Sequence, residues 1–329
     1  MTSPGASPAS RAHGHALVVA RRIRRIRTVN RRDLLLGALA AIPVRALTQS
    51  ARPMLTRPIP STGEPLAVVG LGTWQTFDVG SDRAARTECA ATLQAFLAGG
   101  GRVIDSSPMY GTSEQVVGDL LTARGGSPRP WLATKVWTTG ERAGIDQMNT
   151  SLRRLQVDTI DLMQIHNLVD WRTHLRTLRA WKSEGRVRYL GLTHYQAGAH
   201  DDLARAIQSE SVDLVQVNLS LDEPQAATSL LAACAQRKVG VIVNRPFGGG
   251  ASFARVRARP LPSWSTELGI SSWAQYMLAW ILSFPEVTCV IPGTRRAVHV
   301  LDNLGAGRLP PFGVDVRERM AVEWRRLSS

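Results

Sequence analysis

Cysteine is scarce in this sequence, which contains three thiols in 329 residues. Cys89, Cys234 and Cys289 lie in apolar stretches, and none belongs to a Cys-x-x-Cys pair. An odd number of cysteines without paired spacing excludes a disulfide framework and a cysteine-based zinc site. We expect all three to be small buried hydrophobic residues. The histidines show no metal-ligand spacing either, so no metal site is expected.

The sequence also lacks a long apolar run, because no stretch reaches the roughly 20 residues that a membrane-spanning helix needs. An integral protein with several spans is therefore excluded, and no stable membrane insertion is expected. Apolar residues make up 44% of the chain, which is near the globular norm and excludes a mostly disordered chain. The length allows one to three domains at about 100–200 residues each.

Acidic residues are few: 26 Asp and Glu stand against 40 Lys and Arg, for a formal net charge of +14. Such a balance suggests nucleic-acid binding, but the distribution of the charge argues against it. Residues 1–51 hold nine arginines and one acid, Asp33, and contribute +8 of the total. Residues 52–329 carry the remaining net charge of +6. This part of the chain is therefore only mildly basic, which suits a pocket for a phosphorylated cofactor. No nucleic-acid partner is expected.

The N-terminal segment has the pattern of an export signal. The pair Arg31-Arg32 and the polar Asp33 precede an apolar run over residues 34–46, a length typical of a signal and too short to span a membrane. Residues 30–48 resemble a twin-arginine export signal, which implies recognition by export machinery and a periplasmic or secreted protein. The alternative is an ordinary basic arm, which would leave the protein in the cytoplasm.

The remainder of the chain alternates short apolar runs with amphipathic segments. We accordingly divide it into an N-terminal segment, 1–51, and a folded body, 52–329. Strands are expected at 66–74, 102–107, 131–137, 161–167, 188–194, 214–220, 240–246 and 287–293. Helices are expected at 82–100, 113–124, 141–156, 174–185, 201–208, 226–238, 273–284 and 296–306.

Near-continuous apolar strands that alternate with helices indicate a buried parallel sheet. Eight such units fit an α/β fold of the TIM (β/α)8 barrel type, which is typically about 250 residues long. We expect a short hairpin before the first strand and a tail helix around 313–328. A doubly wound open sheet is disfavoured, because no Gly-x-Gly-x-x-Gly fingerprint joins a strand to a helix.

Titratable side chains stand at the ends of three successive expected strands. Asp105 follows the apolar RVI, Lys135 follows WLAT, and His166 follows DLMQI. Tyr110 comes five residues after Asp105 in the loop that follows. Because the carboxyl ends of barrel strands meet at one mouth, we expect these four side chains to converge there.

The four residue types together suit proton transfer to a carbonyl. A lysine beside a tyrosine favours the phenolate and is expected to bring the Tyr110 pKa down toward neutrality. Asp105 would hold Lys135 charged and oriented, and His166 would donate a hydrogen bond to a carbonyl oxygen. Tyr110 would then give or take the proton, while the hydride comes from elsewhere.

The sequence resembles the aldo-keto reductase superfamily over residues 64–306, most of the body. The matching stretches are GLGTW at 70–74, Asp105 with SSPMYG at 106–111, LATKVW at 132–137, DTIDLMQIH at 158–166, LRAWKSEGRVRYLGLTH at 178–194, QVN at 216–218 and IPGT at 291–294. The resemblance implies that Asp105, Tyr110, Lys135 and His166 are the catalytic tetrad. It further implies reduction of a small-molecule aldehyde or ketone to an alcohol, with Tyr110 as general acid and a nicotinamide cofactor across the barrel mouth.

The resemblance also implies a set of cofactor contacts. They are Gly72, Thr73, Thr193, His194, Gln216, Pro246, Phe247, Gly248, Gly293, Thr294, Arg295, Arg296, Asp302 and Asn303. His194 stands where many relatives have asparagine, and Gly293 where they have lysine. The aromatic residue that packs under the nicotinamide in relatives is replaced by Asn244 or Arg245. Since Arg295 and Arg296 would bind an adenosine 2′-phosphate, NADPH is expected rather than NADH.

Four residues beside the tetrad are expected to shape the substrate pocket: Trp74, Met109, Trp137 and Asn167. For the two tryptophans, packing in the core is the alternative. The long loop 247–270 either covers the cofactor pyrophosphate or is merely solvated.

Two functions without turnover stay open from the sequence. One is a nicotinamide-nucleotide-binding sensor or accessory barrel with little or no turnover, and the other is a structural barrel that binds no cofactor. No heptad repeat is present, so a monomer is expected.

Overall fold

The computed structural model describes residues 52–125 and 129–327. The export signal expected at residues 30–48 lies outside these described residues, and the division of the chain at position 51 stays a prediction. Among the residues described, no helix is both long and apolar enough to cross a membrane.

Eight parallel strands form one sheet in the order β10-β9-β8-β7-β6-β5-β4-β3. Their bounds are β3 Leu71–Gly72, β4 Val103–Asp105, β5 Trp131–Val136, β6 Ile160–His166, β7 Val187–His194, β8 Leu214–Asn218, β9 Gly240–Asn244 and β10 Val287–Val290. Bridges from Val69 to Val290 and from Gly72 to Gly293 join the first strand segment to the last and close the barrel. The expected TIM barrel is confirmed.

Closure of the barrel depends on a glycine. A Cβ atom at Gly72 would lie 2.8 Å from the carbonyl oxygen of Ile291, closer than such atoms approach in folded proteins. A larger residue at position 72 would therefore push the first and last strands apart.

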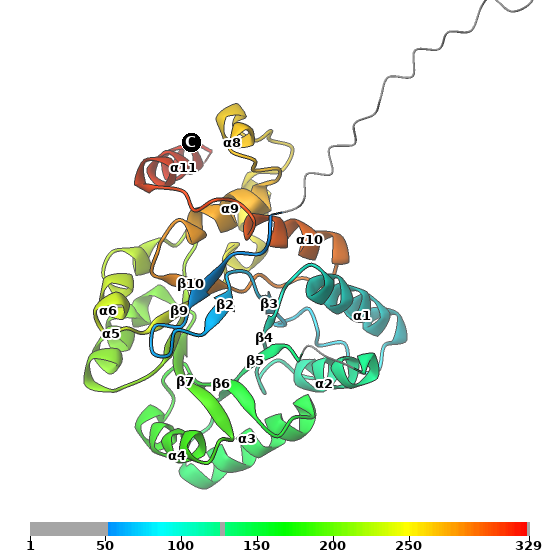
Figure 1. Cartoon of the computed structure of the whole chain (residues 1–329), viewed down its shortest axis with the longest axis vertical. Coiled ribbons are helices and arrows are strands. Elements are labelled where there is room, and N and C mark those ends of the chain that lie inside the picture. The colour runs from blue at the N-terminus through cyan, green and yellow to red at the C-terminus, as the bar shows by residue number, and fades with distance from the viewer. Residues whose placement is uncertain (1–51, 126–128, 328–329) are drawn as a thin grey trace, which may run out of the picture. The chain divides into compact units, whose positions relative to one another are not determined.

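Helices surround the barrel (Figure 1). Those that follow strands are α1 Arg83–Ala98, α2 Ser113–Arg124, α3 Glu141–Leu155, α4 Trp171–Ser183, α5 His200–Ser209, α6 Leu230–Gln236, α9 Trp273–Leu282 and α10 Ala297–Ala306. Short helices α7 Ser252–Arg255 and α8 Ser263–Glu267 lie in the long segment after β9, and α11 Val314–Arg326 is the expected tail helix. The helix expected at 226–238 is shorter, because a 3-10 turn at Gln225–Ala227 precedes α6.

The expected hairpin is present. Strands β1 Thr56–Pro58 and β2 Pro65–Ala67 pair antiparallel. Ile59 and Leu66 of the hairpin join the apolar residues inside the barrel, among them Leu162 and Cys289. The hairpin thereby covers the end of the barrel at which the strands begin.

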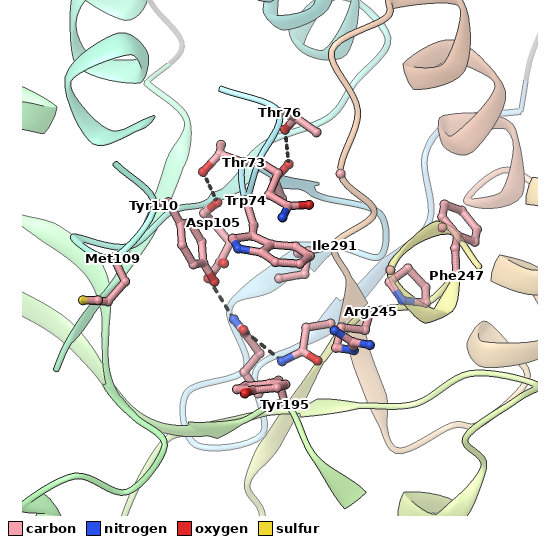
Figure 2. A pocket seen from close by; sticks show the side chains of 18 of the residues that line it. Thr73, Trp74, Thr76, Asp105, Met109, Tyr110, Tyr195, Arg245, Phe247 and Ile291 are labelled. Atoms are coloured by element: carbon pink, nitrogen blue, oxygen red, sulfur yellow. Dashed lines mark hydrogen bonds between the residues drawn. The ribbon is translucent and has the colours of Figure 1, made fainter. Parts of the chain in front are cut away.

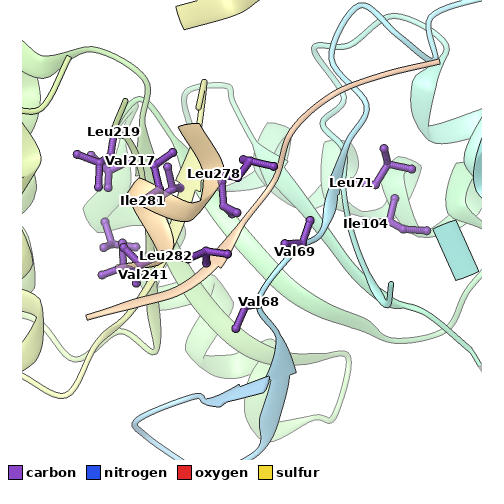
Figure 3. Packing of buried hydrophobic residues seen from close by; sticks show 14 of the residues in the cluster. Val68, Val69, Leu71, Ile104, Val217, Leu219, Val241, Leu278, Ile281 and Leu282 are labelled. Atoms are coloured by element: carbon purple, nitrogen blue, oxygen red, sulfur yellow. The ribbon is translucent and has the colours of Figure 1, made fainter. Parts of the chain in front are cut away.

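A second apolar core lies between the strands and the helices. Figure 3 shows Leu278, Ile281 and Leu282 of α9 among strand residues that include Val217 and Val241. Because successive residues on a strand point to opposite faces, the strands from β4 to β10 each serve both cores.

Strand β6 shows how this alternation builds the site. Met163 and Ile165 belong to the outer core, whereas Leu162 belongs to the inner one. Gln164 and His166 follow Leu162 at two-residue spacing, so the same inner face becomes polar toward the mouth.

Candidate active site

The buried ion pair between Lys135 and Asp105 forms the floor of the site. Lys135 Nζ donates to Asp105 Oδ2 at 2.7 Å and to the carbonyl oxygen of Ser106 at 2.7 Å. Lys135 is 1% exposed and Asp105 is 2% exposed. Because burial of an unpaired charge is very costly, each of the two ions needs the other.

Tyr110 and His166 lie next to this ion pair. Lys135 Nζ is 4.8 Å from the centroid of the Tyr110 ring. The Tyr110 and His166 rings meet edge to face, with centroids 6.4 Å apart. The structure therefore brings together the three residues that the sequence places at strand ends and Tyr110 of the following loop.

The second oxygen of Asp105 is held by two amides that also bind each other. Gln164 Nε2 and Gln216 Nε2 donate to Asp105 Oδ1 at 3.1 and 2.8 Å. Gln216 Nε2 also lies 3.1 Å from Gln164 Oε1. Sequence reasoning missed Gln164. Its position two residues before His166 on the same strand indicates that both side chains point to the inner face of the barrel.

Gln216 connects this floor to the pocket wall. Its Oε1 accepts from Asn244 Nδ2 at 3.2 Å and from Thr193 Oγ1 at 3.4 Å. Its amide is thus engaged on both the nitrogen and the oxygen. Figure 2 shows Asp105, which accepts from this amide, beside Tyr110 in the pocket. The contact from Gln216 to the cofactor that the resemblance implies would have to share one of these atoms.

Burial dominates the acidity of Tyr110. Removal of its hydroxyl from water raises the Tyr110 pKa above the ordinary value, and the positive charge of Lys135 opposes that rise without overcoming it. The expectation that Lys135 brings this pKa toward neutrality is therefore wrong, since the sequence did not reveal how deeply the phenol is buried. A phenol with a raised pKa is a proton donor at neutral pH.

His166 is neutral at physiological pH. Burial, and then the charge of Lys135 and the neighbouring His194, lower its pKa to about 3. A neutral imidazole still carries one N–H and can donate one hydrogen bond. His166 Nδ1 is buried and has no hydrogen-bond partner among the described residues.

These two pKa shifts predict a flat pH profile for carbonyl reduction. Between about pH 5 and pH 9, His166 stays neutral and Tyr110 stays protonated, so kcat/KM should not change. Above the raised pKa of Tyr110 the proton donor is lost and the rate should fall. The profile is measured with a non-ionising aldehyde, and a clear midpoint between about pH 6 and pH 8 would contradict this assignment.

A cavity of about 450 Å³ opens above the floor. Expected site residues that line it are Gly72, Thr73, Trp74, Asp105, Met109, Tyr110, His166, Gln216, Pro246, Phe247 and Gly293. Trp74 and Met109 are 45% and 41% exposed, so both present apolar surface at the mouth. Two other expected pocket residues, Trp137 and Asn167, do not line the cavity. The ring centroid of Trp137 lies 6.2 Å from that of His166, and Asn167 follows His166 in the chain.

The other expected cofactor residues lie outside this cavity: Thr193, His194, Gly248, Thr294, Arg295, Arg296, Asp302 and Asn303. Arg295 Nε forms an ion pair with Glu88 at 2.9 Å, whereas Arg296 is exposed at the start of α10. Asp302 accepts a hydrogen bond from Gln275 Nε2 at 2.8 Å. Arg296 is therefore the more available of the two arginines for a phosphate.

One wall of the cavity contains residues that are absent from the expected set. Tyr195 follows β7 directly, and the Arg245 guanidinium lies 5.8 Å from the centroid of its ring. Arg245 has a positive φ of 49°, a conformation that is uncommon for a side chain other than glycine. Asn244 Oδ1 and Arg245 Nε are buried and have no hydrogen-bond partner within the described parts of the chain. This wall therefore offers both an acceptor and a donor to a ligand.

Comparison with known proteins identifies relatives of most of the body. Residues 68–319 match the model of the Aldo/keto reductase family. Aldo-keto reductase str7 of Strobilurus tenacellus is 30% identical over 257 residues, which cover 66% of this chain and 75% of that protein. Methylglyoxal reductase YeaE of Escherichia coli is 29% identical over 248 residues, which cover 72% of this chain and 84% of that protein.

Solved structures agree with the family match. An aldo-keto reductase from Klebsiella pneumoniae, crystallised in complex with NADPH, superposes with a TM-score of 0.69. It is 26% identical, and the match covers 84% of this chain and 95% of that one.

Proposed function

The chain belongs to the aldo/keto reductase family, and on that premise we propose that it reduces an aldehyde or a ketone to an alcohol with NADPH. The family makes it an oxidoreductase that acts on carbonyl compounds. The observation that carries the finer proposal is the buried Lys135–Asp105 pair at 2.7 Å, directly beneath Tyr110 at the cavity floor.

In this proposal the carbonyl oxygen of the substrate lies between the Tyr110 hydroxyl and His166. Neutral His166 donates a hydrogen bond that orients the carbonyl and polarises it. NADPH, when bound, supplies the hydride that reduces the carbonyl carbon. Tyr110 donates its proton to the alkoxide oxygen, and Lys135 stabilises the phenolate that remains.

The raised pKa of Tyr110 favours one direction of this reaction. A protonated phenol is ready to act as an acid in reduction, whereas oxidation of an alcohol needs the phenolate as a base. The protonated Tyr110 therefore suits the reduction that we propose.

The wall around Asn244 fits a polar cofactor. Its unpartnered Oδ1 is suited to an amide N–H, and the unpartnered Nε of Arg245 to an anionic or carbonyl oxygen. Gly248, Gly249 and Gly250 all have a positive φ. Because glycine has no side chain, the space beside this stretch of backbone stays open. Arg296, exposed at the start of α10, would bind the 2′-phosphate that distinguishes NADPH from NADH.

A fluorescence titration of the full chain with NADPH and with NADH tests the cofactor. Trp74 is 45% exposed and lines the cavity, so a bound nicotinamide should quench its emission. We expect saturable quenching and an affinity for NADPH about tenfold or more above that for NADH, because a charge-assisted phosphate contact contributes about 1.5–3 kcal/mol. Absence of binding by either nucleotide would favour the structural barrel instead.

We also propose that the N-terminal segment directs export and that the folded body is monomeric. In a bacterial host the full chain should appear in the periplasmic fraction, and the Arg31→Lys/Arg32→Lys variant should stay in the cytoplasm. The same distribution of both proteins would contradict export through this pair.

The oligomeric state is tested by size-exclusion chromatography with light scattering. The monomer that we propose should give the mass of one chain, and a mass of two chains would contradict it.

A further inference from the structure

One carboxylate at the mouth end of the barrel joins three segments that are far apart in the sequence. Asp222 lies in the loop after β8, and its two oxygens accept hydrogen bonds from Ser252 Oγ and Trp324 Nε1. Arg255 forms an ion pair with the same carboxylate at 3.0 Å. Ser252 and Arg255 are the first and last residues of α7, whereas Trp324 belongs to the tail helix α11.

These contacts are sheltered from water. Ser252 and Trp324 are 2% and 1% exposed, whereas the Asp222 and Arg255 side chains are partly buried, at 23% and 31% exposure. The Arg255 guanidinium lies 5.2 Å from the centroid of the Trp324 ring, which adds a cation–π contact to the cluster. Ion pairs with this degree of shelter are screened less by salt than exposed ones. The cluster therefore attaches α7 firmly to α11.

The attached segment forms one wall of the cavity. Phe247, Gly249, Gly250 and Phe253 all line it, and the Phe247 and Phe253 rings are 4.9 Å apart. Phe247 and Val256, which are 8% and 5% exposed, anchor this segment in the core, but the three glycines that follow Phe247 have φ values of 57°, 69° and 99°. Backbone of this kind bends easily, so the position of Phe253 depends on what holds α7.

We propose that Asp222 is a positioning residue that holds the 246–255 wall against bound cofactor and substrate, with the tail helix α11 as its anchor. Asp222 does not line the cavity, so it acts through Ser252 and Arg255. The identity of the ligand rests on the proposed function, but the attachment itself does not. Loss of Asp222 should therefore weaken ligand retention and leave proton transfer by Tyr110 intact.

Substitution Asp222→Ala in the full chain removes all three contacts. We expect the NADPH dissociation constant, measured by isothermal titration calorimetry, to rise about tenfold, because local opening of the wall becomes easier. The kcat at saturating NADPH should stay as in the wild type. Trypsin cleavage after the exposed Arg257 should become about tenfold faster, because cleavage follows the population of the open wall. Mass spectrometry identifies the fragment that begins at Ala258.

The matched control is Asp146→Asn, which removes an exposed carboxylate paired with Arg142 on α3 and should change neither readout. If Asp222→Ala fails to fold, Ser252→Ala and Arg255→Met each remove one of the three contacts to Asp222 and should show smaller changes in the same direction. Wild-type values of both readouts in these variants would overturn the proposal, as would faster cleavage with unchanged NADPH affinity. If the wild type binds no NADPH, the proposed function fails, while the trypsin comparison still decides whether Asp222 holds the wall.

Discussion

A Tyr110→Phe variant should lose most of its carbonyl-reducing turnover and keep its affinity for NADPH. The substitution removes the hydroxyl that donates the proton and leaves the ring beside Lys135 and His166 in place. General acid catalysis by a positioned side chain contributes about 100- to 10,000-fold, so kcat should fall by a factor in that range. Steady-state kinetics with an aldehyde and calorimetry with NADPH measure the two effects.

Tyr189→Phe is the matched control for this variant. The Tyr189 hydroxyl contacts Thr62 and Glu64 of the hairpin, and its ring belongs to the apolar interior at the opposite end of the barrel. Loss of the Tyr189 hydroxyl should lower the free energy of unfolding by about 1 kcal/mol and leave turnover unchanged. Wild-type turnover in Tyr110→Phe would remove Tyr110 from the mechanism.

Lys135→Met should both destabilise the protein and abolish turnover. Removal of the cation leaves the Asp105 carboxylate buried at 2% exposure without its partner. Breaking a buried ion pair lowers the free energy of unfolding by about 3–5 kcal/mol. The expected loss lies near the lower end of that range, because the amides of Gln164 and Gln216 still donate to Asp105 Oδ1. Urea unfolding measures the change in the free energy of unfolding.

The double variant Asp105→Asn/Lys135→Met separates stability from chemistry. With both charges gone, no buried ion is left unpaired, so most of the lost stability should return. Turnover should not return, because Tyr110 still lacks the cation that stabilises its phenolate. Equal stability of Lys135→Met and the wild type would show that the two charges do not depend on each other.

The sequence predicted the parts of the site that follow from the strand rule. Asp105, Lys135 and His166 each end an apolar run, and a parallel barrel gathers such ends at one mouth whatever the details of packing. Barrel closure itself also follows from the eight predicted strand–helix units, and the structure shows it in the bridge between Gly72 and Gly293. These features depend on local pattern and on topology, which the sequence carries directly.

Features that depend on tertiary packing were not predicted. The direction of the Tyr110 pKa shift follows from the depth of its burial, which no local pattern encodes. Arg295 pairs with Glu88, a residue 207 positions away in the sequence. The contact between Asp222 and Trp324 spans 102 positions and joins a loop to a helix with which it shares no motif. Contacts of this kind become visible only when the chain is folded.

The most direct test of the account is a single-turnover reaction of the full chain loaded with NADPH and mixed with a panel of aldehydes and ketones. We predict that at least one carbonyl compound is converted to its alcohol, with one alcohol formed for each NADPH oxidised, and that Tyr110→Phe forms none on the same timescale. NADPH that binds but stays unoxidised across the whole panel would contradict the reductase and favour the sensor or accessory barrel.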